Sequence, residues 1–263
     1  MMVGATPSWE DLRARHEGRG ASFAFVIPVY NHARNVAQVA AAAVQSGAPV
    51  LVVDDGSTDG SGEAAAAVVG VRLLRHEGNR GKGAAILTGL AAARAAGASY
   101  AVTVDADGQH RPEEARKLLA ALWRPEAVEP ERALVLGARV GMDMETVPWT
   151  SRMGRGFSGF WVRVSGGPRV SDSQSGFRVY PLAEILALPT RARRFELEVE
   201  VLVQARRAGI PIREVPVSVS YDPPGGRVSH FRPWRDFGRN AATFTRLIAS
   251  RFVPRRKGGR DGT

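Results

Sequence analysis

Two clusters of acidic residues in this sequence each follow a short apolar run. They are Asp54-Asp55 after Val50–Val53 and Asp105-Ala106-Asp107 after Ala101–Val104. In an open parallel sheet the carboxyl ends of the strands border one crevice, so the two clusters are expected to meet there. Because side chains alternate along a strand, Asp105 and Asp107 point to the same side and Gln109 continues the row. An all-oxygen set of this kind suits Mg²⁺ or Mn²⁺, which also binds substrate phosphate.

A purely structural role for these acids is the alternative. Aspartate often caps helices and tightens turns, and Asp59, ahead of a helix at Glu63, is expected to do only that. With 26 acidic residues in the chain, a single Asp-x-Asp can arise by chance. Two clusters that each follow an apolar strand are harder to explain in this way, so binding of a metal and a nucleotide is favoured.

The pattern of apolar residues predicts the elements that hold these acids in place. The expected strands are Phe23–Val29, Val50–Val53, Val71–Leu74, Tyr100–Val104, Leu134–Leu136, Phe177–Tyr180 and Ile212–Val219. The expected helices are Val36–Gln45, Glu63–Val69, Ala84–Ala96, Glu113–Leu122, Trp149–Val164, Leu197–Ala208 and Trp234–Arg251. Strands that alternate with helices predict an α/β fold with a mostly parallel central sheet flanked by helices. Pro216 places the last strand at an edge of that sheet.

The composition narrows the possible partners. The chain has 263 residues and a formal net charge of +10, which indicates an anionic partner: nucleic acid, a phosphorylated substrate or an anionic membrane surface. The absence of cysteine excludes disulfides, a thiol nucleophile and thiolate metal sites. No run of ~20 apolar residues and no signal peptide is present, so we expect a cytoplasmic protein. The histidines lack the spacing of a metal pair and are expected on the surface or in loops; they are His16, His32, His76, His110 and His230.

Six stretches of the sequence resemble a known family. In order and spacing, three resemble the family 2 glycosyltransferases: Phe25–Asn31, Val53–Gly60 and Asp105–His110. Three more resemble the branch that contains dolichol-phosphate mannosyltransferase and bacterial polyprenyl-phosphate glycosyltransferases: Asn79–Gly83, Ser175–Tyr180 and Glu214–Val217. The resemblance extends from residue 23 to about residue 237. It implies a GT-A fold, a GDP- or UDP-sugar donor and Mg²⁺ or Mn²⁺ as cofactor.

The resemblance also implies roles for single residues. The implied nucleotide-sugar site contains Pro28, Tyr30, Val53, Asp55, Asp105, Ala106, Arg152 and Arg227, and the implied metal ligands are Asp105, Asp107 and Gln109. His32 stands where the mannosyltransferases usually have an acidic residue, which leaves the nucleotide base open. Arg227 and His230 occupy the place of a late basic pair in that branch.

Three residues are implied to be catalytic, namely Asp107, Arg139 and Asp172. Arg139 matches an arginine that binds donor or acceptor phosphate. Asp172 would act as general base if the acceptor were a hydroxyl group. A phosphate acceptor is already anionic at neutral pH, and Asp172 would then only position its loop. Both roles stay open at this point.

The chain divides most simply into four parts. These are an N-terminal extension (1–22), a GT-A catalytic domain (23–233), an amphipathic basic helix (234–252) and a disordered basic tail (253–263). In Trp234–Arg251 apolar residues recur at spacings of three and four, and the arginines lie largely off that stripe. Such a helix can lie in a membrane interface beside anionic lipid. Packing of the same stripe on the domain is the other possibility.

Together these features predict an inverting, metal-dependent glycosyltransferase that transfers a sugar from a nucleotide-sugar to a polyprenyl phosphate of the dolichyl or undecaprenyl type. It would be a peripheral protein on the cytoplasmic face of the cell membrane, with no nucleic-acid partner. The alternative is a family 2 glycosyltransferase with a hydroxyl acceptor on a glycolipid or polysaccharide precursor. A nucleic-acid-binding protein would explain the charge, but acids at strand ends repel phosphate unless a metal is bound.

Overall fold

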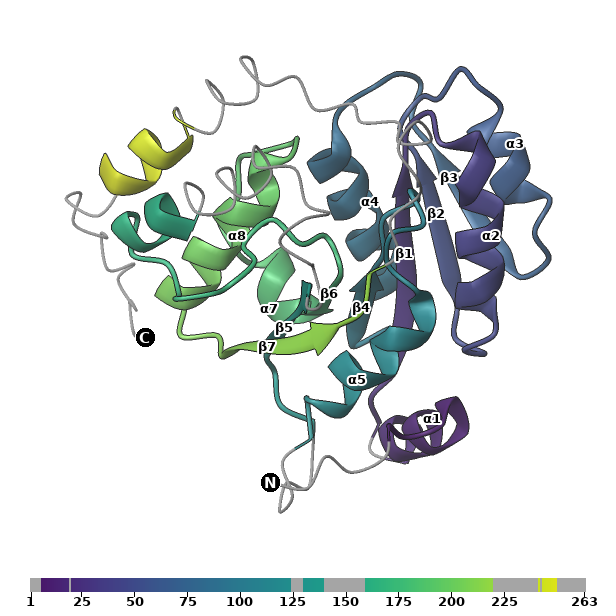
Figure 1. The fold of residues 1–263 in the computed structure, drawn as a ribbon, viewed down its shortest axis with the longest axis horizontal. Helices are drawn as coiled ribbons and strands as arrows, with labels where there is room; N and C mark the ends of the chain where they lie inside the picture. Colours follow the sequence, from purple (N-terminus) through teal and green to yellow (C-terminus); the bar gives the residue numbers. More distant parts are fainter. Residues whose placement is uncertain are drawn as a thin grey trace, which may run out of the picture.

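The computed structural model describes residues 6–18, 20–123, 130–139, 159–219, 241 and 243–249. Their centre is a seven-stranded sheet with the order β3-β2-β1-β4-β6-β5-β7 (Figure 1). The strands are β1 (Phe23–Val29), β2 (Val50–Asp54), β3 (Val71–Arg75), β4 (Tyr100–Thr103), β5 (Leu134–Arg139), β6 (Arg178–Pro181) and β7 (Ile212–Val217). Each strand lies within a few residues of its expected position.

The sheet is mostly parallel, as predicted. β1 runs parallel to β2 and β4, β2 to β3, and β5 to β7, while β6 runs antiparallel to both of its neighbours. β1, β2 and β4 are buried along their whole length, as expected for strands covered by helices on both faces. β7 carries Pro216 and lies at the edge of the sheet.

Helices cover both faces of the sheet. They are α1 (Trp9–Glu17), α2 (Ala33–Val44), α3 (Ser61–Ala66), α4 (Lys82–Ala95), the 3₁₀ turn η1 (Pro112–Glu114), α5 (Ala115–Ala120), α7 (Leu182–Leu186) and α8 (Glu196–Arg207). The apolar side chains of α1, α2 and α5 form the core on one face, and those of α4, α7 and α8 form the core on the other. Residues 159–164 and 243–249 are also helical.

The N-terminal extension contains a helix that the apolar pattern did not predict. Only Leu12 and His16 of α1 are buried, which is too little apolar periodicity to recognise, although Ser8 and Asp11 form a capping box that the sequence carries openly. The expectation that the histidines lie on the surface or in loops was wrong for His16, which is buried in α1; His76 and His110 lie in loops as expected, but they too are buried. His16 packs edge-on against the rings of three aromatic residues, which explains its burial.

The expected helix over Trp234–Arg251 falls only partly within the described residues. In the described part, Phe244 and Leu247 are buried against Val162, Val199 and Val203. This portion of the apolar stripe therefore packs on the domain, which is the second of the two possibilities that the sequence left open. The basic tail at 253–263 lies outside the described residues. Among the described helices, none has both the length and the apolar character needed to cross a bilayer.

Candidate active site

The carboxyl ends of β1, β2 and β4 lie next to one another at one end of the sheet (Figure 1). Both acidic clusters of the sequence follow these strands, so the two clusters lie at the same edge of the sheet, as their positions in the sequence predicted. A side-chain contact joins the first turn of α2 to the loop after β4, because the Asn35 amide donates a 2.7 Å hydrogen bond to the carbonyl oxygen of Asp107. Asp59 has the structural role expected of it, since its carboxylate accepts from the backbone N–H groups of Ala33 and Ser61 at two helix starts.

Asp54 and Asp55 organise the loops around the crevice. Asp54 is 1% exposed and binds Arg75 at 3.0 Å and the Ser57 N–H at 2.8 Å. The carboxylate of Asp55 accepts hydrogen bonds from the backbone N–H groups of Arg80 (2.9 Å) and Gly81 (2.7 Å), and His76 Nδ1 lies 2.6 Å away. Asp55 thereby fixes the loop that leads into α4. Its contact with a nucleotide stays a prediction.

A partly buried ion triad lies where β4 ends. Lys82 Nζ, in the first turn of α4, lies 2.7 Å from Asp105 Oδ1 and 2.8 Å from Glu198 Oε1 of α8. Burial disfavours the charged form of each group, but the carboxylates outweigh it at Lys82 and raise its pKa. In the same way, burial is outweighed at Asp105 by the Lys82 ammonium, and the pKa of Asp105 lies below its ordinary value. Both groups are charged at neutral pH.

Gly176 closes the crevice from the side of β6. A Cβ atom at this position would lie 2.6 and 2.7 Å from the two carboxylate oxygens of Asp105 and 2.8 Å from Lys82 Nζ. Thr103 holds the segment in place, because its hydroxyl donates a 2.7 Å hydrogen bond to the Gly176 carbonyl. The motif Ser175–Tyr180 therefore needs glycine where it faces the triad.

His110 is a buried neutral residue of the same crevice. Its ring stacks on Phe177 with the ring centres 5.1 Å apart, and burial lowers its pKa to about 4, despite the attraction of Asp105. An uncharged imidazole beside the acids adds no positive charge to the site. The sequence offered no signal for this role beyond the position of His110 directly after Gln109.

Asp107 and Gln109 lie partly exposed on the loop after β4. One oxygen of the Asp107 carboxylate accepts a 3.0 Å hydrogen bond from the Gln109 N–H. The described residues contain no cluster of three or more acidic or histidine side chains arranged to hold a metal ion. Mg²⁺ needs only one or two protein carboxylates, because water and substrate phosphate complete its shell. Asp107 and Gln109 carry oxygen donors of the right chemistry on one loop, whereas the carboxylate of Asp105 is bound to Lys82, and metal binding by these residues stays a prediction.

Arg139 and Asp172 form a bidentate ion pair at the end of β5. Arg139 Nε and Nη2 lie 2.5 and 2.8 Å from the two carboxylate oxygens of Asp172, which is 3% exposed. Glu214 of β7 holds this loop by accepting hydrogen bonds from the Ser171 N–H at 2.7 Å and the Asp172 N–H at 3.3 Å. The sequence singled out both partners of the pair but not their contact.

The family profile described as "Glycosyl transferase family 2" matches residues 24–186, which is more than half of the chain. The chain belongs to this family. It is therefore a glycosyltransferase, and the resemblance of its motifs is confirmed.

Two relatives of this glycosyltransferase bear names that state an acceptor. The UDP-N-acetylglucosamine–dolichyl-phosphate N-acetylglucosaminyltransferase of Methanococcus voltae is 34% identical over 155 residues, which cover 57% of this chain and 60% of the relative. The undecaprenyl-phosphate mannosyltransferase of Micrococcus luteus is 29% identical over 205 residues, or 73% of this chain and 81% of the relative. The chain thus spans less than two thirds of the first relative's length.

A solved structure of glucosyl-3-phosphoglycerate synthase from Mycobacterium tuberculosis with Mg²⁺ and uridine diphosphate has the same fold. Its TM-score with this glycosyltransferase is 0.67 at 22% identity, and the match covers 95% of this chain and 85% of that one. This likeness confirms the GT-A fold that the motifs implied.

The other residues assigned to the nucleotide-sugar site are placed as follows. Pro28 and Val53 are buried partners on β1 and β2, Ala106 is buried between the two acids, and Tyr30 is partly exposed directly after β1. Arg152 and Arg227, together with His230, lie outside the described residues. Sequence reasoning missed Glu198, His76 and His110 as residues of the site. It recognised the motif around Lys82 without giving that lysine a role.

Proposed function

We propose that this glycosyltransferase transfers a sugar from a GDP- or UDP-sugar to a polyprenyl phosphate, with inversion at the anomeric carbon. The names of its relatives support a dolichyl or undecaprenyl phosphate as acceptor. In the structure, the observation that carries the choice of acceptor is the bidentate pair of Arg139 and Asp172.

The pair favours a phosphate acceptor over a hydroxyl acceptor. A hydroxyl group must lose a proton as it attacks, and Asp172 was the candidate base. Both of its carboxylate oxygens instead accept hydrogen bonds from Arg139. A phosphate monoester carries its negative charge already and needs no base. In this proposal Asp172 is a positioning residue that aims Arg139, and Arg139 supplies positive charge to a phosphate.

The residues after β4 would hold the donor. Asp107 and Gln109 would bind Mg²⁺ or Mn²⁺ together with the diphosphate, and Asp105, oriented by Lys82, would accept from ribose hydroxyl groups. The bound cation would supply charge neutralisation for the departing nucleoside diphosphate. Lys82 and Arg139 add positive charge from two sides of the crevice, and such fixed charge stabilises the leaving group without reorganisation. Transfer by one displacement gives inversion.

A donor and acceptor panel tests the proposal. The purified chain is incubated with UDP- and GDP-sugars, Mg²⁺ or Mn²⁺, and either a short polyprenyl phosphate or the matching polyprenol, and the product masses are read. We expect a glycosyl phospholipid from the phosphate only, and its loss in Asp107→Asn with an unchanged melting temperature. A product from the polyprenol alone would overturn the choice of acceptor, and a fully active Asp107→Asn enzyme would overturn the role of that carboxylate.

We also propose that the enzyme works at the cytoplasmic face of the membrane as a peripheral protein without a nucleic-acid partner. A lipid-linked acceptor supports this location, and the excess positive charge suits an anionic lipid surface. Co-sedimentation with anionic and with neutral vesicles, with DNA and RNA as competitors, tests both parts. Binding to nucleic acid in preference to anionic vesicles would count against the proposal.

A further inference from the structure

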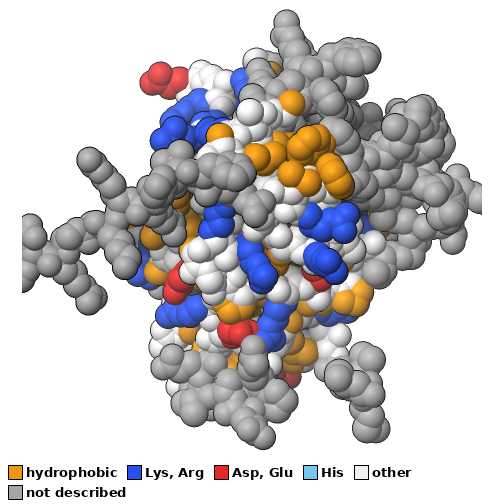
Figure 2. Space-filling view, turned by 90° about the vertical axis from the view of Figure 1, so that its left-hand side faces the viewer, with side chains coloured by type: hydrophobic (Ala, Val, Ile, Leu, Met, Phe, Trp, Pro, Cys, Tyr) orange, Lys and Arg blue, Asp and Glu red, His pale blue; other side chains and the backbone are white. Residues whose placement is uncertain are grey.

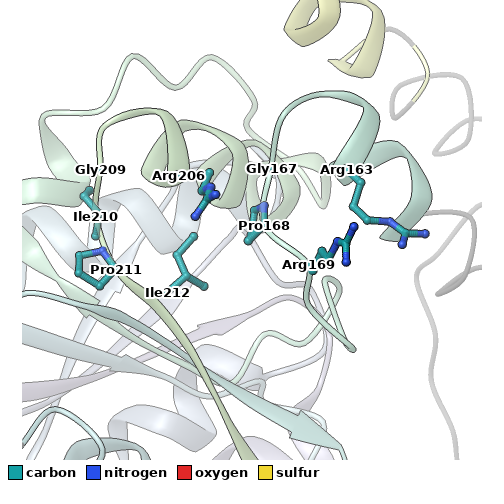
Figure 3. A pocket seen from close by; sticks show the side chains of 9 residues that line it. All are labelled: Arg163, Gly167, Pro168, Arg169, Arg206, Gly209, Ile210, Pro211 and Ile212. Carbon is teal, nitrogen blue, oxygen red and sulfur yellow. The ribbon is translucent and has the colours of Figure 1, made fainter.

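A basic hollow lies between the end of α8 and the start of β7 (Figure 3). Its volume is about 650 Å³, within the range of small-molecule sites. Arg206 reaches it from the last turn of α8, Arg163 from the helix at 159–164, and Arg169 from the loop that follows this helix. The remaining lining residues are Gly167, Pro168, Gly209, Ile210, Pro211 and Ile212.

The hollow is separate from the crevice that holds the acidic clusters. Ile212 pairs with Leu134 at the start of β5, whereas Arg139 lies at the other end of β5 and pairs with Val217. Five residues of strand separate the two positions, which is about 17 Å. The hollow therefore lies toward the opposite end of the sheet from the catalytic arginine.

The three arginines of the hollow have no side-chain partner in the part of the chain that the structure describes. Within the described residues, none of their guanidinium groups has a hydrogen bond or an ion pair, and all three side chains are exposed. The described lining contains no aspartate or glutamate. The neighbouring Arg207 is different, because it donates hydrogen bonds to the carbonyl oxygens of Ser165 (2.9 Å) and Leu247 (2.6 Å). The guanidinium of Arg207 is therefore held by the fold, whereas no described residue binds that of Arg206.

Helix dipoles explain only part of this arrangement. The negative ends of α8 and of the helix at 159–164 favour basic residues, which accounts for Arg206 and Arg163. Arg169 lies on a loop and has no such reason to be there. In Figure 1, α8 lies toward the left of the molecule, and Figure 2 shows this left-hand side facing the viewer. Among the side chains coloured by type in Figure 2, Lys and Arg are more abundant than Asp and Glu. The local charge therefore attracts anions.

We propose that this hollow binds a phosphate group, apart from the donor and acceptor of the transfer reaction. A guanidinium group matches phosphate oxygens with two parallel hydrogen bonds, and three arginines line this hollow with no carboxylate among the lining residues. The lining between the arginines is apolar, with Pro168, Ile210 and Ile212. It suits a phosphate that carries an apolar body more than a strongly hydrated anion alone.

Two arms of one experiment distinguish the source of the phosphate. In the first arm, inorganic phosphate is titrated into the full chain without divalent metal, and the amide resonances of Gly167 and Gly209 are followed by NMR. In the second arm, the chain is sedimented with vesicles of phosphatidylglycerol in phosphatidylcholine, and with phosphatidylcholine alone. Binding in the first arm but not in the second identifies a soluble phosphate compound as the ligand. Excess binding to the anionic vesicles identifies a lipid headgroup.

A charge-matched pair of variants makes the test specific. Arg169→Gln with Arg206→Gln is expected to weaken binding at least about tenfold in the arm that is positive. The control, Arg72→Gln with Arg94→Gln, removes the same charge from exposed positions elsewhere and is expected to change binding by less than about twofold. UDP binding in the presence of Mg²⁺ serves as a fold control for both. Equal loss in the two variants, or no binding in either arm, overturns the proposal and leaves the proposed transferase activity untouched.

Discussion

The Lys82→Met substitution leaves Asp105 and Glu198 without the ammonium group that lies between them. Removing one partner of a buried ion pair typically costs about 3–5 kcal/mol, because a charge stays behind uncompensated. The Lys82 and Asp105 side chains are 18% and 24% exposed, so water offsets part of this cost and about 2–4 kcal/mol remains. For a chain of this size, we expect the melting temperature to fall by about 5–15 °C.

The pH dependence of this loss has a definite sign. In the wild type the pKa of Asp105 is lowered, so its contribution to stability is present above its unfolded pKa of about 4 and is lost as the pH falls through the folded value. Without Lys82, burial and Glu198 raise the pKa of Asp105 in the folded variant, which is then stabilised as the pH falls toward that value. The difference in melting temperature between wild type and variant should narrow from about pH 7.5 to about pH 5.

Scanning calorimetry or a thermal shift assay across this pH range measures both effects. The matched control is Lys117→Met, because this lysine is 35% exposed, against 18% for Lys82, and its ion pair with Glu114 is worth about 0–1 kcal/mol. Adding Glu198→Gln to Lys82→Met should recover part of the loss, since one uncompensated carboxylate is removed. If Lys82→Met melted like the control, or if its deficit stayed the same on acidification, the ion triad would not have the energetic role assigned to it.

Three further predictions concern substitutions of Gly176, Asp172 and Phe244. Gly176→Ala places a Cβ against Asp105 and should cost about 1–3 kcal/mol of stability and weaken nucleotide binding, measured by melting and calorimetric titration. Asp172→Asn removes the partner that aims Arg139 and should lower turnover with the phosphate acceptor without changing the shape of the pH–rate profile; loss of the acidic limb, on which activity falls as a base is protonated, would restore Asp172 as a general base. Phe244→Ala should cost about 3–5 kcal/mol, because its side chain is 4% exposed in the core, and a shift as small as that of an exposed alanine substitution would exclude this packing.

The strands of the sheet could be predicted because a buried strand is recognisable in the sequence as a run of apolar residues. β1 was expected at Phe23–Val29 and has these bounds, since a strand buried on both faces is a continuous apolar run with polar ends. α7 was not predicted, because a helix of one turn and a half has no room for a periodic pattern. The rule that the carboxyl ends of parallel strands border a ligand site was enough to predict that the two acidic clusters lie at the same edge of the sheet.

Contacts between distant segments could not be predicted in the same way. Lys82 and Glu198 belong to helices that are far apart in the chain. Neither their residue types nor the local sequence pattern shows that the two side chains contact each other. The roles of Asp107, Arg139 and Asp172 came from resemblance, whereas their partners come from the fold. Burial of a histidine is equally hidden, because His16 and His110 depend on aromatic rings supplied by other elements.

The use of the positive charge shows why a count of arginines does not locate an anion site. Arg178 is fully buried and donates to three backbone carbonyl groups, so it serves the fold. Arg246, one of the arginines in the predicted helix Trp234–Arg251, is bound to Glu200 at 2.8 Å. Arg139 is held by Asp172 in the crevice. An external anion is attracted most strongly where several guanidinium groups lie without such partners, and among the described residues Arg163, Arg169 and Arg206 line one hollow in this way. In the proposal made above, part of the net charge of +10 therefore acts away from the acidic clusters, at a position that only the fold brings together.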